Sequence, residues 1–283
     1  MLPDNASEAG LTWTGPPAVS RIETATAAGS ISALAWGADE VSVVLLHGGA
    51  QNAHTWDTVA LALREPLVAI DLPGHGHSAW REDGSYGPES NAETLVPVIE
   101  RLATPPVVLV GMSLGGLTAL ALTAARPDLV AKLVVVDVTP GVDRDKAAPI
   151  AAFVSGPESF ATFDELLERT IQFNPTRTES SLRRGLIHNT RQRDDGHWVW
   201  RYDRFREGGG FDFPPLWDAV GALTIPVTLL RGSLSGVVSD DDVARFRELA
   251  PHTDYRLVDG AGHSIQGDKP VELAAILREV IDG

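Results

Sequence analysis

A serine lies inside a short glycine-rich motif in the first half of the chain, GMSLGG at residues 111–116, with Ser113 near its centre. The motif follows an apolar, β-branched run and opens a helical pattern. Glycines suit such a sharp strand-to-helix turn because a Cβ there would collide with the neighbouring elements. The turn strains the serine backbone and exposes its hydroxyl beside a helix N-terminus, which favours developing negative charge. In this context the motif predicts that Ser113 is a nucleophile.

The elements that must position this serine can be predicted from hydrophobic patterning. Continuous apolar runs typical of parallel strands buried on both faces occupy residues 41–46, 67–70, 106–110, 133–138, 227–230 and 255–258. Helical patterns lie between or after them at 56–64, 92–102, 114–125, 241–249 and 271–281. Residues 21–35 alternate more and fit an antiparallel edge hairpin. Strands alternating with helices predict an α/β fold with a mostly parallel sheet flanked by helices.

One long interval, residues 139–213, interrupts this alternation. It contains helical patterns, with apolar residues recurring over 160–171 and over 182–188, and a short alternating segment at 197–203. Three glycines at 208–210 form a flexible joint near its end. We predict a helical cap at 139–213, inserted into a sheet domain made of residues 1–138 and 214–283; the alternative is further helical core. The first dozen residues are polar and aperiodic, which predicts a frayed tail.

Three further motifs stand at the ends of predicted strands, and with the serine motif they resemble the α/β-hydrolase superfamily over nearly the whole chain. The sequence His47-Gly48-Gly49 follows the third strand, where the family places its oxyanion loop. Residues 71–78 (DLPGHGHS) resemble the family's D-x-P-G-x-G-x-S turn, and residues 260–264 (GAGHS) resemble its histidine loop. Four motifs in order are far more specific than one. The resemblance implies an α/β-hydrolase fold with a helical cap insertion.

The resemblance also implies the roles of individual residues. A serine hydroxyl is a poor nucleophile until a base accepts its proton, and the histidine loop supplies His263. An imidazole titrates near neutral pH and can then protonate the leaving group. Attack on an acyl carbon creates an oxyanion, which two backbone N–H groups can stabilise, one from Leu114 and one from Gly49. The expected centre is therefore Ser113 with His263 and these two donors.

The acid that should support the histidine has two candidate positions. The family's commoner location follows the seventh strand, but that slot holds Ser235, which has no charge. The second family solution follows the sixth strand, where this chain has Asp137, and we predict Asp137 as the acid. The alternatives, Asp240, Asp241 and Asp242, look more like a helix N-terminus. Two other acids near strand ends, Asp71 and Asp259, are expected to bond loop amides in turns.

The other histidines give weaker signals. His75 and His77 form an H-x-H pair, but the pattern places no third ligand, so we predict no metal site and no cofactor. His47 is expected to brace the oxyanion loop. His188 and His197, in the predicted cap, are expected to be solvated or packed rather than catalytic.

Composition excludes several classes of protein. The formal net charge of −15, from 38 acids and 23 bases, repels nucleic acid and anionic membranes, so neither is an expected partner. The absence of cysteine excludes disulfides, thiolate metal sites and cysteine nucleophiles. The N-terminus lacks a secretory pattern, and no stretch approaches the roughly 18 to 20 apolar residues that span a bilayer. These features lead us to expect a cytoplasmic protein that acts on a small molecule; they do not indicate its oligomeric state.

The nucleophile narrows the reaction, although the fold alone does not name one. Dehalogenases and epoxide hydrolases of this superfamily attack with aspartate, whereas this chain has Ser113. The leading hypothesis is therefore hydrolysis of a carboxylic ester, lactone or thioester through an acyl-serine. The alternatives are a carbon–carbon bond hydrolase or a cofactor-free perhydrolase on the same residues, and a small-molecule receptor that retains them.

Overall fold

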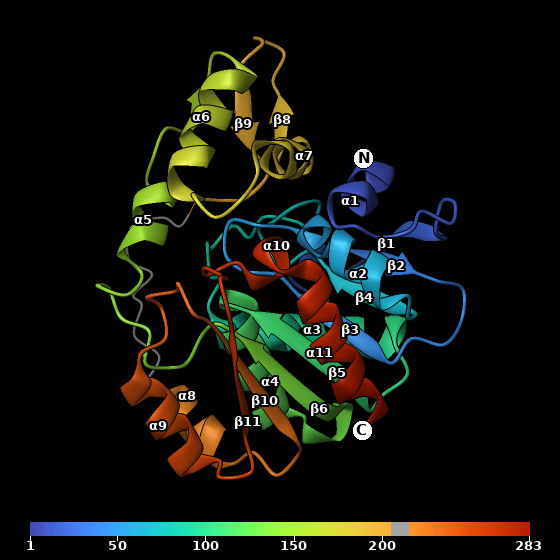
Figure 1. Cartoon of the computed structure of the whole chain (residues 1–283), viewed down its shortest axis with the longest axis vertical. Coiled ribbons are helices and arrows are strands. Elements are labelled where there is room, and N and C mark those ends of the chain that lie inside the picture. Colours follow the sequence, from blue (N-terminus) through green and yellow to red (C-terminus); the bar gives the residue numbers. More distant parts are fainter. Residues whose placement is uncertain (205–214) are drawn as a thin grey trace.

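The computed structural model describes residues 1–204 and 215–283 and is built around one eight-stranded sheet, in the order β1-β2-β4-β3-β5-β6-β10-β11 (Figure 1). The strands are β1 (Val19–Thr26), β2 (Gly29–Trp36), β3 (Val43–Leu46), β4 (Leu67–Ile70), β5 (Val107–Met112), β6 (Val130–Val136), β10 (Val227–Gly232) and β11 (Asp254–Val258). Strand β2 is antiparallel to β1 and β4, and the other neighbours are parallel. The predicted mostly parallel sheet with an antiparallel edge hairpin is confirmed.

Helices cover both faces of this sheet. They are α1 (Leu2–Glu8), η1 (Ala53–Trp56), α2 (Asp57–Leu63), α3 (Pro88–Leu102), α4 (Leu114–Ala125), η2 (Pro127–Leu129), α8 (Pro215–Gly221), α9 (Asp240–Leu249), α10 (Ile265–Asp268) and α11 (Pro270–Asp282). One apolar cluster joins α3, α4, α8 and α9 to one face, and a second joins η1, α2 and α11 to the other. The helices predicted from periodicity are therefore present, with ends that differ by a few residues.

The central strands are buried on both sides, which explains their uninterrupted apolar sequences. In β3, Val44 and Leu46 pack into the first cluster, whereas Val43 and Leu45 pack into the second. Successive side chains of a strand point to opposite faces, so both sets must be apolar when helices cover both faces. Each fully buried side chain of this size contributes about 1.5–3 kcal/mol to folding.

The prediction of a frayed N-terminal tail is wrong, because residues Leu2–Glu8 form α1. Ala6 of this helix is buried, and Leu2 packs against the apolar cluster that contains α2. Glu8 accepts hydrogen bonds from the Thr178 and Ser180 hydroxyls. These partners lie more than 100 positions away in the sequence, so a pattern within the first dozen residues could not reveal them.

A separate unit, which we call the insertion (residues 148–202), lies between β6 and α8 and sits above the main sheet in Figure 1. Its elements are α5 (Ala148–Val154), β7 (Ser159–Phe160), α6 (Phe163–Phe173), α7 (Glu179–Asn189), β8 (Thr190–Gln192) and β9 (Trp198–Trp200). The two expected helices form, but the insertion also contains a small antiparallel sheet, β7-β9-β8. Phe160, expected on a helix, belongs to that sheet. The glycine joint at 208–210 lies outside the described residues.

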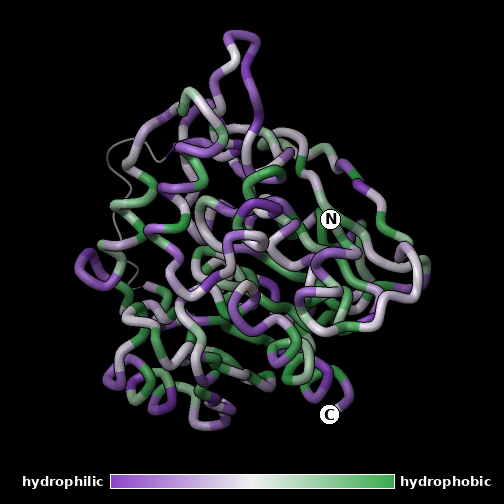
Figure 2. Tube along the Cα trace, turned by 45° about the horizontal axis from the view of Figure 1, so that its top comes forward, coloured by the Kyte–Doolittle hydropathy of each residue, from purple (hydrophilic) through white to green (hydrophobic). Residues whose placement is uncertain are grey.

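The insertion has its own apolar core. Phe160, Leu166, Leu186 and Trp200 pack together there, with Ala50 contributed from the loop after β3. Figure 2 shows hydrophobic residues concentrated on the inner strands and hydrophilic residues on the outer loops. Among the described residues, no helix combines the length and the apolar character needed to cross a bilayer.

Candidate active site

Ser113 occupies a strained turn between β5 and α4. Its backbone has φ 51° and ψ −120°, a conformation that residues with a Cβ rarely adopt. A Cβ on Gly111 would lie 2.2 Å from the carbonyl oxygen of Gly115, and one on Gly115 would lie 2.4 Å from that of Leu46. The flanking glycines are therefore needed for the close approach of strand and helix, as the sequence motif indicates.

The structure brings the three predicted side chains together in a chain of hydrogen bonds. The Nε2 atom of His263 lies 3.1 Å from Oγ of Ser113, and its Nδ1 atom lies 2.7 Å from Oδ2 of Asp137. Ser113 follows β5, Asp137 follows β6 and His263 follows β11, so all three stand at the carboxyl edge of the sheet. This geometry allows the imidazole to accept a proton from the serine while the carboxylate holds its other nitrogen.

Asp137 is fully buried, and its carboxylate is fixed by several donors. The backbone N–H of Gly232 donates to Oδ1 at 2.9 Å, and the hydroxyl of Ser235 donates to Oδ2. The backbone of Asp137 also has a positive φ of 52°. In the sequence, Ser235 is only the slot where the family commonly has its acid. In the structure it follows the neighbouring strand β10 and is a hydrogen-bond partner of Asp137.

The alternative acids make other contacts. Asp242 forms a capping box with Ser239 at the start of α9 and pairs with Lys146 at 2.7 Å. Asp240 is exposed and pairs with Arg231. These interactions fit the predicted helix N-terminus. The carboxylate that forms a hydrogen bond with His263 is that of Asp137.

The two predicted oxyanion donors belong to Leu114, next to Ser113 in the chain, and to Gly49, in the loop after β3. Leu114 is the first residue of α4, so its N–H has no acceptor within that helix. Gly49 lines the same cavity as Ser113, in the loop after β3. A Cβ on the preceding Gly48 would lie 3.2 Å from that of Ser113, so this loop passes directly beside the serine. An N–H at a helix N-terminus, such as that of Leu114, is suited to hold an anionic oxygen.

Two buried histidines support this loop. His47 accepts a hydrogen bond from the Leu72 N–H through Nε2, at 2.9 Å, and its Nδ1 lies 2.7 Å from the Gly48 carbonyl. His75 accepts from the Ala50 N–H through Nε2, at 3.1 Å. Burial lowers the pKa of both, that of His47 to about 3, so both rings are neutral at pH 7. With its Nε2 used in this way, His75 is poorly placed for the H-x-H metal pair considered from the sequence.

Asp71 organises the turn at 71–78. Its Oδ1 accepts from the Ala53 N–H at 2.7 Å, its Oδ2 accepts from the His77 N–H at 3.1 Å, and Arg21 pairs with it at 2.9 Å. Burial raises the pKa of the Asp71 carboxyl, but the hydrogen bonds from these two N–H groups and the Arg21 guanidinium lower it by more, so the net shift is downward. This is the expected bonding of loop amides. Asp259 instead accepts from the Ser233 hydroxyl at 3.2 Å.

A cavity of about 970 Å³ contains Ser113 and His263 and is bordered by both the sheet domain and the insertion. Phe153, Leu182 and Trp200 line it from the insertion. Trp217, by contrast, packs in the core of the sheet domain against Phe246. A volume of this size can hold a small organic molecule.

With this geometry established, comparison with known proteins assigns the family. The model of the Alpha/beta hydrolase family matches residues 43–276, which include all three side chains and the insertion. The chain belongs to the alpha/beta hydrolase family.

Two mycobacterial proteins show the relationship in sequence. The esterase Rv0045c of Mycobacterium tuberculosis is 50% identical over 290 residues, covering 100% of this chain and 95% of its own length. The lipase LipV of the same organism is 28% identical, covering 83% of this chain and 91% of its own. A solved structure described as "Transition metal inhibition and structural refinement of the M. tuberculosis esterase, Rv0045c" superposes with a TM-score of 0.89 at 49% identity, covering 100% and 97%.

Proposed function

We infer that this chain is a carboxylic ester hydrolase that uses Ser113 as nucleophile, His263 as general base and Asp137 as the supporting acid. The observation that carries the proposal is the pair of hydrogen bonds of the His263 ring. Nε2 lies 3.1 Å from the serine Oγ, and Nδ1 lies 2.7 Å from the aspartate Oδ2. Membership of the alpha/beta hydrolase family and 50% identity to an esterase support ester hydrolysis as the reaction.

In the first half-reaction, His263 accepts the hydroxyl proton as Ser113 Oγ attacks the acyl carbon. The buried carboxylate of Asp137 stabilises the imidazolium that forms and keeps Nε2 directed at the serine. The oxyanion is held by the backbone N–H groups of Gly49 and Leu114, and the positive end of α4 adds to their effect. His263 then protonates the leaving alcohol, and the acyl group remains on Ser113.

In the second half-reaction, a water molecule replaces the alcohol. His263 accepts a proton from the water as it attacks the acyl-serine, and then returns a proton to Ser113 Oγ as the carboxylic acid leaves. These two half-reactions require no charged cofactor, because backbone donors and the helix terminus stabilise the developing negative charge. A lactone would follow the same steps, with the alcohol retained in the product.

We further propose that residues 139–213 act as a cap that selects the acyl group. Phe153, Leu182 and Trp200 of the insertion supply apolar surface to the cavity that Ser113 also lines. Apolar side chains around a few polar groups are typical of a site for a small organic substrate.

The test combines labelling with turnover. A fluorophosphonate should modify Ser113, and Ser113→Ala should abolish both labelling and turnover of p-nitrophenyl esters and lactones. Ser155→Ala, at an exposed serine in the insertion, is the matched control and should behave as the parent chain. Undiminished ester turnover in Ser113→Ala would refute the assignment.

The same assay separates the alternative functions. An esterase cycles many times per chain, whereas a receptor that retains these residues would release product slowly or only once. A carbon–carbon hydrolase or a perhydrolase would prefer a diketone or peroxide-dependent reaction over simple esters. Repeated turnover of esters, lost with Ser113, is the expected result.

A further inference from the structure

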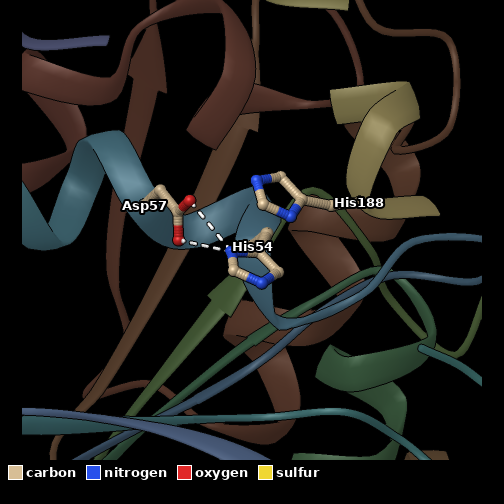
Figure 3. Close-up of side chains that lie close together, drawn as sticks. All are labelled: His54, Asp57 and His188. Carbon is tan, nitrogen blue, oxygen red and sulfur yellow. Dashed lines mark hydrogen bonds and ion pairs between the residues drawn. The ribbon is translucent and has the colours of Figure 1, made fainter. Parts of the chain in front are cut away.

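A cluster that the proposed reaction does not use lies at the junction of the insertion and the sheet domain. It consists of His54 in η1, Asp57 at the start of α2 and His188 near the end of α7 (Figure 3). One potential ligand atom from each residue lies within 4.8 Å of the others. All three residues also line the cavity that contains Ser113.

We propose that His54, Asp57 and His188 form a binding site for a divalent transition-metal ion such as Zn²⁺, which fastens the insertion to the sheet domain beside the cavity. Two imidazoles and one carboxylate form a donor set that Zn²⁺ and related ions favour, whereas Ca²⁺ and Mg²⁺ prefer oxygen ligands alone. An open fourth position would be taken by water, as is usual when a site has three protein ligands.

The carboxylate of Asp57 is well placed to bind a cation. It is buried, and the partner that the structure gives it is Nδ1 of His54, at 3.0 and 3.2 Å from its two oxygens. A carboxylate has about four acceptor positions, and a buried one is stabilised by a positive partner. The spacing of His54 and Asp57, three residues apart, keeps both side chains on one face of the η1–α2 turn.

His188 is held beside this pair by its neighbours. Asn189, the next residue, donates to the Ala50 carbonyl at 2.7 Å and accepts from the Asn52 side chain at 3.0 Å, which docks the end of α7 on the loop before η1. The rings of His188 and His54 are stacked, with their centroids 3.6 Å apart. Among the described residues, the His188 ring has no hydrogen-bond partner, so its lone pair is available.

The charges around the cluster permit binding but limit its strength. Burial lowers the pKa of His188 to about 3, and the nearby His54, Arg21, His77 and N-terminal amine add to this effect, so the ring is neutral, which is the ligand form. The guanidinium of Arg21 adjoins the cluster, with Nη2 3.0 Å from Nε2 of His54, but it is already paired with the buried carboxylate of Asp71.

Binding requires a small rearrangement with a defined proton balance. Bonds of about 2.0–2.2 Å to Zn²⁺ draw the donors closer than their present separation, so the His188 ring must turn out of the stack toward Asp57. The ion replaces the proton on Nδ1 of His54. That proton moves to Nε2, and the Nη2 contact of Arg21 opens while its Nη1 keeps the bonds to Asp71 and Ser32.

Calorimetric titration of the whole chain with Zn²⁺ tests the site directly. We expect one ion per chain, with affinity lowered at least tenfold by His188→Phe and by Asp57→Asn. His188→Phe retains an aromatic ring for stacking but no ligand atom, so it separates metal binding from packing. His252→Ala, at an exposed histidine, is the matched control and should bind like the parent chain.

Several results would overturn the proposal. Absence of saturable Zn²⁺ binding would do so, as would parent-like binding by His188→Phe. Displacement of Zn²⁺ by an equal concentration of Ca²⁺ would show binding to surface carboxylates of this acidic chain instead. Hydrogen exchange tests whether the ion fastens the insertion to the sheet domain. Zn²⁺ should slow amide exchange at α7 and η1 in the parent chain but not in His188→Phe. Unchanged exchange in the parent chain would refute the fastening.

Discussion

Replacing Asp137 by asparagine gives the sharpest test of the proposed centre. The N–H of Gly232 donates to Oδ1, so an asparagine oxygen must take that position and its NH₂ must take the position of Oδ2. That NH₂ would then donate toward Nδ1 of His263, where the carboxylate now accepts at 2.7 Å. To accept this hydrogen bond, Nδ1 of the imidazole must be unprotonated. The proton of the neutral ring then lies on Nε2, facing Ser113.

A ring with its proton on Nε2 cannot accept the hydroxyl proton of Ser113. The change therefore removes the base as well as the charge that stabilises the imidazolium. We expect Asp137→Asn to lower kcat by about 10³ to 10⁴, the scale known for the same change in a serine protease. By transition-state arithmetic this is roughly 4–5.5 kcal/mol.

The assay compares kcat on one p-nitrophenyl ester, after circular dichroism has shown that each variant is folded. Asp242→Asn is the matched control, because Asp242 is also buried and hydrogen-bonded but belongs to the capping box with Ser239 at the start of α9. Loss of a cap costs about 1 kcal/mol of stability, and kcat should change less than tenfold. If Asp242→Asn were the inactive variant and Asp137→Asn nearly normal, the acid would follow β10 and the reasoning would be wrong.

Two further predictions concern the cavity wall and the oxyanion loop. Phe153→Ala should shift the preference between short and long acyl chains by about 1–3 kcal/mol in kcat/KM, since Phe153 lines the cavity; an equal change for every chain length would contradict a selecting cap. His47 has a pKa of about 3 in the folded state, below its ordinary value of 6.5. Below pH 6.5 the folded state therefore binds fewer protons than the unfolded state. The free energy of unfolding should then fall by roughly 1 kcal/mol per pH unit as the pH drops. His47→Gln can keep both hydrogen bonds without titrating, so its unfolding free energy should decline less between pH 7 and pH 5; parallel curves in urea denaturation would contradict this.

The buried strands and the nucleophile turn were predictable because they depend on short-range rules. A strand covered on both faces needs an unbroken apolar run, as β3 shows, and the order of strands and helices follows from chain connectivity. The turn at Ser113 needs glycine at Gly111 and Gly115 because backbone atoms pass within 2.2–2.5 Å of where a Cβ would lie.

Elements stabilised from a distance were predicted less well. The sequence of α1 has no apolar periodicity, and the helix is held by packing on α2 and by polar contacts with the insertion. The small sheet of the insertion uses strands of two or three residues, too short for an alternating pattern to identify. The cluster of His54, Asp57 and His188 likewise brings together two segments that lie far apart in the chain, so no local pattern could reveal it.

The sequence by itself determined the family resemblance, the strand–helix order and the candidate nucleophile, because each depends on patterns of residues close together along the chain. It left two positions open for the acid. Only the tertiary structure decides which carboxylate reaches His263, since Asp137 is 126 residues away from it and the parallel pairing of β6, β10 and β11 brings their carboxyl ends to one edge. There Asp137 meets the ring at 2.7 Å, whereas Asp242 is held at the start of α9 by Ser239 and Lys146.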